Sequence, residues 1–413
     1  MHPLFSKIER GSVPHVTDWM QELGGDSCIL ERMKETPQES EWHGEGNVHV
    51  HTDLVLGEIE AMLRPGGEAA HLSGGRRQAL VLGALLHDLG KVFTTQEREI
   101  DGRLRIVSPQ HPSRGRSWWA LHHHSLGLSP EVVEAVLALI GHHHDPRRLV
   151  SAEAGLFAYR KLARLCDLEL LYLLETADLR GRKAANRDAE LELLEWFRTQ
   201  AMDYGVWGDP DPWKDWREHI EAALQGESRS VRRLALAEGI RDAEQGRIFT
   251  PHEAVAKSYT WRQRGREPGE LVVLCGLSGA GKSSWAESQL RGHARVSLDR
   301  WREKIAGNRS DHSREGEVIQ AARGELREYL RKAQPVVWDA TSLLRDQRSA
   351  VVQLGMDYHA WVEITCVSTP LEEIRRRQRQ RVPPPPIRLI DRQIERCEWP
   401  FATQAHAMNT IAG

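Results

Sequence analysis

The spacing of hydrophobic residues differs between the two halves of the chain. From about residue 45 to residue 225 they recur every three or four positions, as in helices with one buried face. The segment 129–131, Ser-Pro-Glu, is typical of a helix start, and Gly90, Gly141 and Gly181 stand where helices are expected to end. This half is predicted to be all-α.

After residue 270, short and almost continuously apolar runs replace the helical spacing. They cover residues 271–275, 336–338 and 361–367, and helical stretches separate them. Such runs, alternating with helices, are typical of a parallel sheet that is covered on both faces. We therefore expect a multidomain protein, with an all-α domain followed by an α/β domain that contains a parallel sheet. The expected boundaries are 1–205 for the helical domain, 206–268 for a helical, tryptophan-containing connector and linker, and 269–413 for the α/β domain.

Composition narrows the class of protein. The chain has 56 Lys and Arg against 59 Asp and Glu, a net charge of −3. This balance argues against a uniformly basic nucleic-acid coat protein, although it allows a local basic groove. The five cysteines form no C-x-x-C pair, and we find neither a signal-peptide core nor an apolar run of about 18 residues. We expect a cytoplasmic protein with reduced thiols and no membrane partner.

Histidine is concentrated in the helical half. Of the 20 histidines, 12 lie between residues 43 and 144. His87 and Asp88 end an apolar helix, Asp178 lies on the apolar face of another, and His51 lies at the start of a third. Burying such groups is costly unless something pairs with them, and a divalent metal is the obvious partner.

These four residues, in this order, resemble the H…HD…D signature of the HD phosphohydrolase superfamily. The sequence segments around them resemble those of the HD domains appended to bacterial tRNA nucleotidyltransferases, and the resemblance covers roughly residues 40–185. By this resemblance His51, His87, Asp88 and Asp178 hold a divalent transition metal, which their chemistry allows to be Mn, Fe, Co, Ni or Zn.

The resemblance extends to further residues of the helical half. His111 and His143 stand where many HD enzymes carry additional histidines for a second metal or for the phosphate. Alternatively, each is a hydrogen-bonded histidine at a helix end. Lys91 is expected to contact a substrate phosphate, or else to be a favourable cation near a helix C-terminus.

The first apolar run of the α/β half leads directly into a glycine-rich loop. Residues 276–283 follow the G-x-x-x-x-G-K-S pattern and open a helix, which is the strand-to-helix context of a phosphate-binding loop. In such a loop, backbone N–H groups wrap the phosphates of an NTP, the lysine reaches the β- and γ-phosphates, and the serine hydroxyl binds Mg²⁺. The residues expected to contact ATP or Mg²⁺ are Gly276, Ser278, Gly279, Gly281, Lys282, Ser283 and Ser284.

Polar residues follow two further probable strands, at the edge where open α/β sheets bind their ligands. Asp299 comes after a strand expected at about Val296, and Asp339 comes directly after the run 336–338. Asp299 is there positioned to take the proton from an attacking hydroxyl. From residue 270 to about 400 the chain resembles phage-type polynucleotide 5′-kinases, whose D-x-x-R pair supplies a general base and an arginine for the acceptor's phosphate. The resemblance gives the base role to Asp299, the phosphate contact to Arg302 and an acceptor-side orienting role to Asp339.

An arginine-rich segment lies further along. Residues 375–381 contain five arginines and precede Val382 and four prolines. The segment is either a charged helical face beside a rigid break or part of a kinase lid near 371–386 that closes over the transferring phosphoryl group. Arg377 and Arg381, four positions apart, share one helix face, and we expect them to be the catalytic arginines.

The order of the two domains resembles the bacterial bifunctional end-healing enzymes, in which an HD domain is fused to a polynucleotide kinase. The resemblance implies removal of 2′,3′-cyclic phosphate, 3′-phosphate and 2′-phosphate ends by the HD domain, and phosphorylation of 5′-OH ends by the kinase. RNA or DNA termini would be the substrates, and an RNA ligase would be the functional partner. The alternatives are an HD nucleotide phosphohydrolase fused to a small-molecule kinase, and a non-enzymatic sensor that binds RNA and nucleotide.

Overall fold

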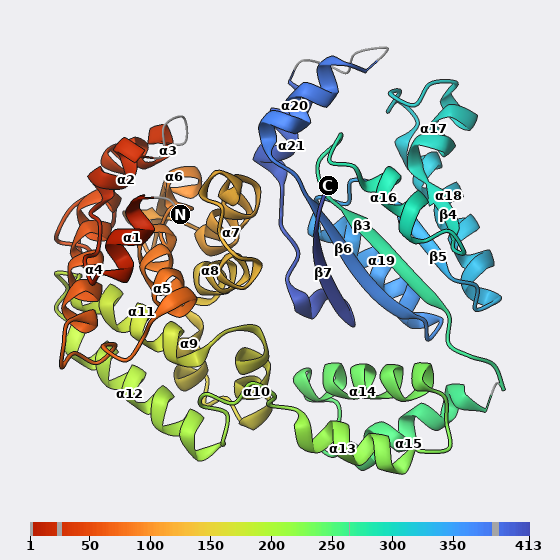
Figure 1. Ribbon diagram of the computed structural model, residues 1–413, viewed down its shortest axis with the longest axis horizontal. Helices are drawn as coiled ribbons and strands as arrows, with labels where there is room; N and C mark the ends of the chain where they lie inside the picture. The colour runs from red at the N-terminus through yellow and green to blue at the C-terminus, as the bar shows by residue number, and fades with distance from the viewer. Residues whose placement is uncertain (1–2, 23–26, 264, 382–387) are drawn as a thin grey trace. The chain divides into compact units, whose positions relative to one another are not determined.

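The computed structural model describes residues 3–22, 27–263, 265–381 and 388–413 (Figure 1). By its internal contacts the chain divides into two compact units, residues 1–212 and 213–413. The division falls inside the segment 206–268 that was predicted to connect the domains. Val382 and the four prolines after it, which were predicted to follow the arginine-rich helix, lie outside the described residues.

The first unit is built mainly of helices, as predicted. Its central helices are buried on several faces: residues 79–86 of α5 are all buried, as are residues 170–179 of α11. The α-helices of this unit are α1 (Pro3–Glu9), α2 (Val16–Glu22), α3 (Ser27–Arg32), α4 (Val48–Leu63), α5 (Gly74–Leu86), α6 (Lys91–Thr94), α7 (His111–His122), α8 (Pro130–His142), α9 (Asp145–Ser151), α10 (Leu156–Leu165), α11 (Leu168–Arg180) and α12 (Arg187–Asp203).

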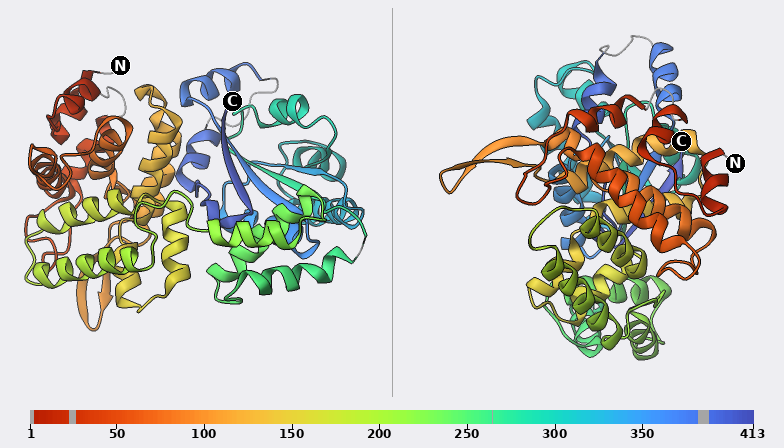
Figure 2. Two further views of the ribbon diagram at one scale, coloured as in Figure 1. Left: turned by 60° about the horizontal axis from the view of Figure 1, so that its bottom comes forward. Right: turned by 90° about the vertical axis from the view of Figure 1, so that its left-hand side faces the viewer.

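An antiparallel hairpin interrupts the helical unit, where the sequence analysis predicted only helices. Strand β1 (Gln96–Ile100) pairs with β2 (Arg103–Val107), and the hairpin projects from the unit in the right-hand view of Figure 2. The turn residues Asp101 and Gly102 both have positive φ, 51° and 73°, as a two-residue hairpin turn requires. The strands bury little apolar surface, so they lack the alternation by which a strand is predicted. The Asp-Gly pair was the available signal.

The second unit begins with three helices, α13 (Lys214–Ala223), α14 (Arg229–Glu244) and α15 (Pro251–Arg262). Trp213 and Trp216, from the tryptophan-rich segment of the sequence, are buried here with their ring centroids 5.2 Å apart. These two indoles therefore have a packing role in this unit.

The sheet of the second unit is entirely parallel, as predicted, and has five strands in the order β4-β5-β3-β6-β7 (Figure 1). Alternate residues of the central strand β3 face different helices: Val272 and Leu274 pack with Ala286 of α16, whereas Leu271 lies against Gly355 of α19. The strands are β3 (Glu270–Cys275), β4 (Ala294–Ser297), β5 (Val336–Asp339), β6 (Trp361–Ser368) and β7 (Ala407–Ala412). The helices are α16 (Lys282–Gln289), α17 (Leu298–Ala306), α18 (Glu315–Arg331), α19 (Arg345–Asp357), α20 (Leu371–Arg379) and α21 (Leu389–Arg396).

The order of the strands places the predicted kinase residues at one edge of the sheet. Strand β3 lies at the centre, so the phosphate loop that follows it emerges beside the carboxyl end of β5, where Asp339 stands. Strand β4 flanks β5 and leads into α17, which carries Asp299. Loops at the carboxyl edge of a parallel sheet can therefore meet around one ligand.

Candidate active sites

Six predicted metal ligands from five helical segments come together in the first unit. His51 comes from α4, His87 and Asp88 from the end of α5, and Asp178 from α11; His111 begins α7 and His143 follows α8. Each of these side chains is buried, the most accessible being His111 with 8% of its surface exposed.

The first four ligands form a tight cluster. His51 Nε2 lies 2.9 Å from Asp178 Oδ1 and 3.6 Å from Asp88 Oδ2. His87 Nε2 lies 3.4 Å from Asp88 Oδ2 and 3.8 Å from Asp178 Oδ1. Two imidazole nitrogens and two carboxylates thus face one small space.

His111 and His143 border the same space on the other side of Asp88. Their Nε2 atoms lie 3.3 Å apart, and His111 Nε2 lies 3.2 Å from Asp88 Oδ1. His144 lies within reach of the same pair, and its ligand atom could join theirs on one ion.

A glycine permits the close approach of His111. A Cβ atom at Gly90 would lie only 1.9 Å from the backbone oxygen of His111, so no larger residue fits between the turn after His87-Asp88 and the start of α7. The glycine two residues after Asp88 is therefore part of what assembles the site.

The outer nitrogens of three histidines determine which ring atom faces the cluster. Nδ1 of His87, His111 and His143 each lies 2.9 Å from a backbone oxygen, that of Ala84, Ser108 and Ile140 respectively. These Nδ1 atoms donate, so each Nε2 presents its lone pair to the carboxylates.

Lone pairs that face carboxylates, and one another, need a cation between them. His87 Nε2 is buried and has no hydrogen-bond partner among the described residues. Neutral imidazoles combined with carboxylates are ligands that suit a divalent transition metal. The residues present therefore fit the metal that the sequence predicted.

Two cations hold the carboxylates in the anionic form. Burial by itself would raise the pKa of Asp88, but Lys91, whose Nζ lies 2.7 Å from Oδ2, acts together with His87 and His111 and holds this pKa well below its usual value. In the same way burial would raise the pKa of Asp178, but Arg182, which binds both carboxylate oxygens, acts together with His51 and His87 and lowers this pKa well below its usual value. Lys91 also donates to Gln38 Oε1 at 2.7 Å.

The phosphate loop of the second unit has the backbone that its glycines permit. Gly279 and Gly281 have φ values of 87° and 97°, in the region that favours glycine. Lys282 is buried, and its Nζ donates to the backbone oxygens of Gly276 and Leu277 at 3.0 and 2.8 Å. Burial lowers the pKa of Lys282.

Comparison with protein families gives a match in each unit of the chain. A family described as HD domain matches residues 56–178, and a family described as AAA domain matches residues 271–400. The chain is an HD domain followed by a P-loop kinase-like domain. The HD match includes five of the six clustered ligands and begins just after His51. Comparison with proteins of curated function gave no match.

Asp339 of the kinase-like domain lies beside the phosphate loop. Its Oδ2 accepts hydrogen bonds from Ser283 Oγ at 3.0 Å and from Arg295 Nε at 2.8 Å. The expected role of Asp339 was to orient the acceptor, yet it binds the serine that was expected to bind Mg²⁺. Ser284 follows on α16 and is exposed.

Asp299 and Arg302 lie one turn apart on α17 and form an ion pair. Asp299 is 58% exposed, so its carboxylate is open to an incoming hydroxyl. The guanidinium of Arg302 also donates to both oxygens of Glu315, from Nε at 2.9 Å and Nη2 at 2.7 Å. Glu315 therefore orients Arg302, a role for which the sequence gave no sign.

The arginine-rich segment reaches the phosphate loop from α20 and from just beyond it. The prediction that Arg377 and Arg381 share one helix face was wrong, because α20 ends at Arg379 and Arg381 lies outside the helix. Arg377 Nη1 donates to the oxygen of Gly279, and Arg381 Nη1 donates to Ser278 Oγ, both at 3.3 Å. Gln378, between them, donates to the oxygen of Ser278 at 2.7 Å. The structure thus brings together the two predicted arginines and adds a glutamine that was not predicted.

Two residues of the HD domain were not predicted as part of the site. Glu45 Oε1 lies 2.8 Å from His43 Nδ1 and 2.9 Å from His51 Nδ1, so it orients the first metal-ligand histidine from outside. The second is Gln38, the partner of Lys91. Glu45 stands in the segment that resembled other HD domains, whereas nothing in the sequence distinguishes Gln38.

None of the helices in the described part of the chain combines the length and hydrophobicity needed to span a bilayer.

Proposed function

We propose that the protein heals RNA ends. The HD domain removes 2′,3′-cyclic phosphate, 3′-phosphate or 2′-phosphate, and the kinase-like domain transfers the γ-phosphate of ATP to a 5′-OH. The observation that supports this best is the ion pair of the exposed Asp299 with Arg302 in a kinase-like domain that shares its chain with a buried His/Asp centre. Ribonucleases that leave a cyclic phosphate also leave a 5′-OH, and a partner RNA ligase requires both ends to be repaired.

In the HD domain the protein residues would position the phosphoester and its attacking water. His51, His87, Asp88 and Asp178 would hold a divalent transition metal. When bound, such a metal lowers the pKa of a water and offsets negative charge on a phosphoryl group. Lys91 would keep Asp88 oriented and anionic.

His111 and His143 are proposed to act on the Oδ1 side of Asp88. Their paired Nε2 atoms, 3.3 Å apart, suit either a second cation or an oxygen of the phosphate. The same geometry serves both roles, because each nitrogen presents its lone pair as an acceptor and becomes a donor once protonated.

In the kinase-like domain Asp299 would accept the proton of the 5′-hydroxyl. The hydroxyl oxygen then bonds to the γ-phosphorus as the bond to the β–γ bridging oxygen breaks, and ADP leaves. Lys282, Arg377 and Arg381 would contact the phosphates. Arg302, steadied by Glu315, would bind the acceptor's first phosphate.

We place Asp339 on the donor side of this reaction rather than on the acceptor side. Its hydrogen bond with Ser283 and its ion pair with Arg295 support a role in holding Mg²⁺ with the phosphate loop. An aspartate at the end of the strand beside the loop serves this purpose in P-loop enzymes generally.

An acceptor screen tests the proposal. In a kinase assay the protein is given ATP, Mg²⁺ and Mn²⁺ with 5′-OH oligonucleotides, nucleosides or sugars as acceptors. In a separate phosphoesterase assay it is given oligonucleotides with phosphorylated ends or free mononucleotides. We expect turnover of oligonucleotide ends in both the kinase assay and the phosphoesterase assay. Turnover confined to mononucleotides and sugars would favour an HD nucleotide phosphohydrolase fused to a small-molecule kinase, and binding without turnover would favour a sensor.

A further inference from the structure

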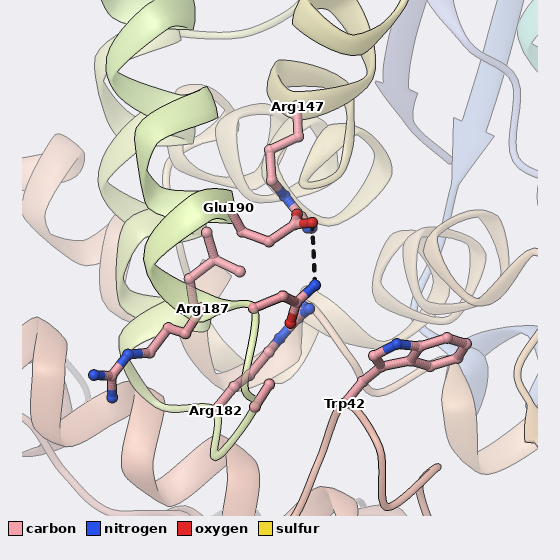
Figure 3. A pocket seen from close by; sticks show the side chains of 8 residues that line it. Trp42, Arg147, Arg182, Arg187 and Glu190 are labelled. Carbon is pink, nitrogen blue, oxygen red and sulfur yellow. Dashed lines mark hydrogen bonds and ion pairs between the residues drawn. The ribbon is translucent and has the colours of Figure 1, made fainter.

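A pocket beside the HD centre has no part in the chemistry described so far. Its volume is about 230 Å³, and its wall includes Trp42, Arg147, Leu179, Arg182, Asn186 and Glu190 (Figure 3). Arg182 connects it to the centre: Arg182 Nε lies 3.0 Å from Asp178 Oδ1, and that oxygen lies 2.9 Å from His51 Nε2. A molecule whose phosphate reached the centre could therefore place its next group in this pocket.

Trp42 gives the pocket an aromatic wall. Its side chain is large and apolar yet 43% exposed. The guanidinium of Arg105, on the β1-β2 hairpin, lies 5.5 Å from the ring centroid, and Arg105 also pairs with Glu41. The indole is thus held by a cation from the hairpin while part of its surface remains open. Open indole surface of this kind can stack on a nucleobase.

The wall away from Trp42 is polar and fixed by internal contacts. Arg147 pairs with Glu175 and Glu190, and its Nη2 lies 3.3 Å from His144 Nδ1. Asn186 Nδ2 donates to Glu190 Oε1 at 3.4 Å. Asn186 uses its nitrogen in this bond, so its amide oxygen can accept a hydrogen bond from a ligand. Arg182 binds Asp178 through Nε and Nη2, so its Nη1 can donate to a ligand.

The size of the pocket limits what it can hold. Small-molecule sites usually measure about 300–1,000 Å³. At about 230 Å³ this pocket suits at most one nucleoside rather than several nucleotides.

We propose that the pocket binds the terminal nucleoside of the HD substrate, with Trp42 stacking on the base and with Arg182 and Asn186 hydrogen-bonding to its polar edge or to the ribose. The HD domain would then select phosphate esters that carry a nucleoside over simple alkyl phosphates. This inference rests on the proposed end-healing function, since it names what the same centre recognises.

The test is direct binding, with the phosphate loop first blocked by saturating Mg-ADP. Titration calorimetry compares adenosine 3′-monophosphate with glycerol 2-phosphate on the wild-type protein, Trp42→Ala and Trp42→Phe. Trp196→Ala is the matched control, because Trp196 is also exposed, at 54%, and does not line the pocket.

We expect the nucleotide to bind the wild type and Trp196→Ala about tenfold or more tightly than glycerol 2-phosphate, in keeping with the usual effect of base stacking. Trp42→Ala should lose this preference, and Trp42→Phe should keep most of it. Equal affinity of Trp42→Ala and wild type for the nucleotide would overturn the proposal.

The two proposals can fail separately. If RNA ends are not turned over but nucleotide binding still depends on Trp42, the pocket assignment is supported and end healing is wrong. If RNA ends are turned over and Trp42→Ala leaves both nucleotide affinity and KM unchanged, end healing stands and the pocket assignment is wrong.

Discussion

Ser283 of the phosphate loop donates a hydrogen bond to Asp339, with its Oγ 3.0 Å from Oδ2, although 55 residues separate them in the sequence. The contact exists because β5 lies next to β3 in the sheet. It connects Asp339 to the nucleotide side of the kinase-like domain.

Replacing Asp339 by Asn should therefore change the response to Mg²⁺. We expect the Mg²⁺ concentration for half-maximal kinase activity to rise about tenfold, while the KM for a 5′-OH oligonucleotide stays near that of the wild type. Initial rates measured across a Mg²⁺ series and an oligonucleotide series separate the two effects. A raised acceptor KM with an unchanged Mg²⁺ requirement would instead support the acceptor-side role.

The arginines of α20 should differ in importance according to their contacts. Arg377 reaches the phosphate loop, whereas Arg376 is exposed and pairs with Glu373 on its own helix. We expect Arg377→Ala to lower kcat for phosphoryl transfer by about 10³-fold, the smaller effect seen for arginines that stabilise this transition state. Arg376→Ala is the matched control and should change kcat less than about twofold. Equal losses in both variants would mean that the helix contributes only general positive charge.

Binding of a metal should stabilise the HD domain. A ligand present at 100 times its Kd stabilises the folded state by about 2.7 kcal/mol. After treatment with a chelator, added Mn²⁺ should raise the thermal unfolding midpoint of the wild-type protein but not that of Asp178→Asn, which lacks one ligand. The measurement is differential scanning fluorimetry, with Mg²⁺ as the comparison ion. A Mn²⁺ shift of the same size in Asp178→Asn would show that the ion binds elsewhere.

The stability of the second unit should fall as the pH is lowered below about 6.5. Burial lowers the pKa of His406 from 6.5 to about 3, and its Nδ1 accepts a hydrogen bond from the Val362 backbone N–H at 3.0 Å, which requires the neutral ring. Between these pH values the unfolded chain binds a proton that the folded chain does not, so the free energy of unfolding falls as the pH is lowered.

The matching variant is His406→Gln, whose amide oxygen can accept the same hydrogen bond without titrating. Its free energy of unfolding in urea, measured from pH 7 to pH 5, should depend less on pH than that of the wild type, by up to about 1.4 kcal/mol per pH unit. Identical slopes for the two proteins would contradict the assignment of this proton to His406.

Local motifs account for the features that the sequence predicted well. The phosphate loop is one continuous segment. His87, Asp88 and Gly90 form a short motif whose metal-binding chemistry can be predicted without knowing the fold. The parallel sheet was predicted because strands buried on both faces are continuously apolar. For Arg377 and Arg381 the helical period predicted one shared face. Both side chains do reach the phosphate loop, although α20 ends at Arg379 and Arg381 lies beyond it.

The remaining features depend on residues that only the tertiary structure brings together. The pocket beside the HD centre joins Trp42 to Arg147 and Asn186, which are more than 100 residues away along the chain. The pairing of Glu315 with Arg302 depends on how α18 packs against α17. Strand β7 was missed because it is an edge strand in which exposed Asn409 and Thr410 interrupt the apolar residues.

The central claim is that one chain repairs both ends of a broken RNA at two separate sites. The direct measurement uses an RNA with a 5′-OH and a 2′,3′-cyclic phosphate, incubated with ATP, Mg²⁺ and Mn²⁺ and then resolved for both end groups. The wild type should yield 5′-phosphate and free 3′ ends; Lys282→Ala and Asp299→Ala should lose only the first product, and Asp88→Ala only the second. If any one of these substitutions abolished both activities in a protein that is still folded by circular dichroism, or if the wild type altered neither end, the account would be wrong.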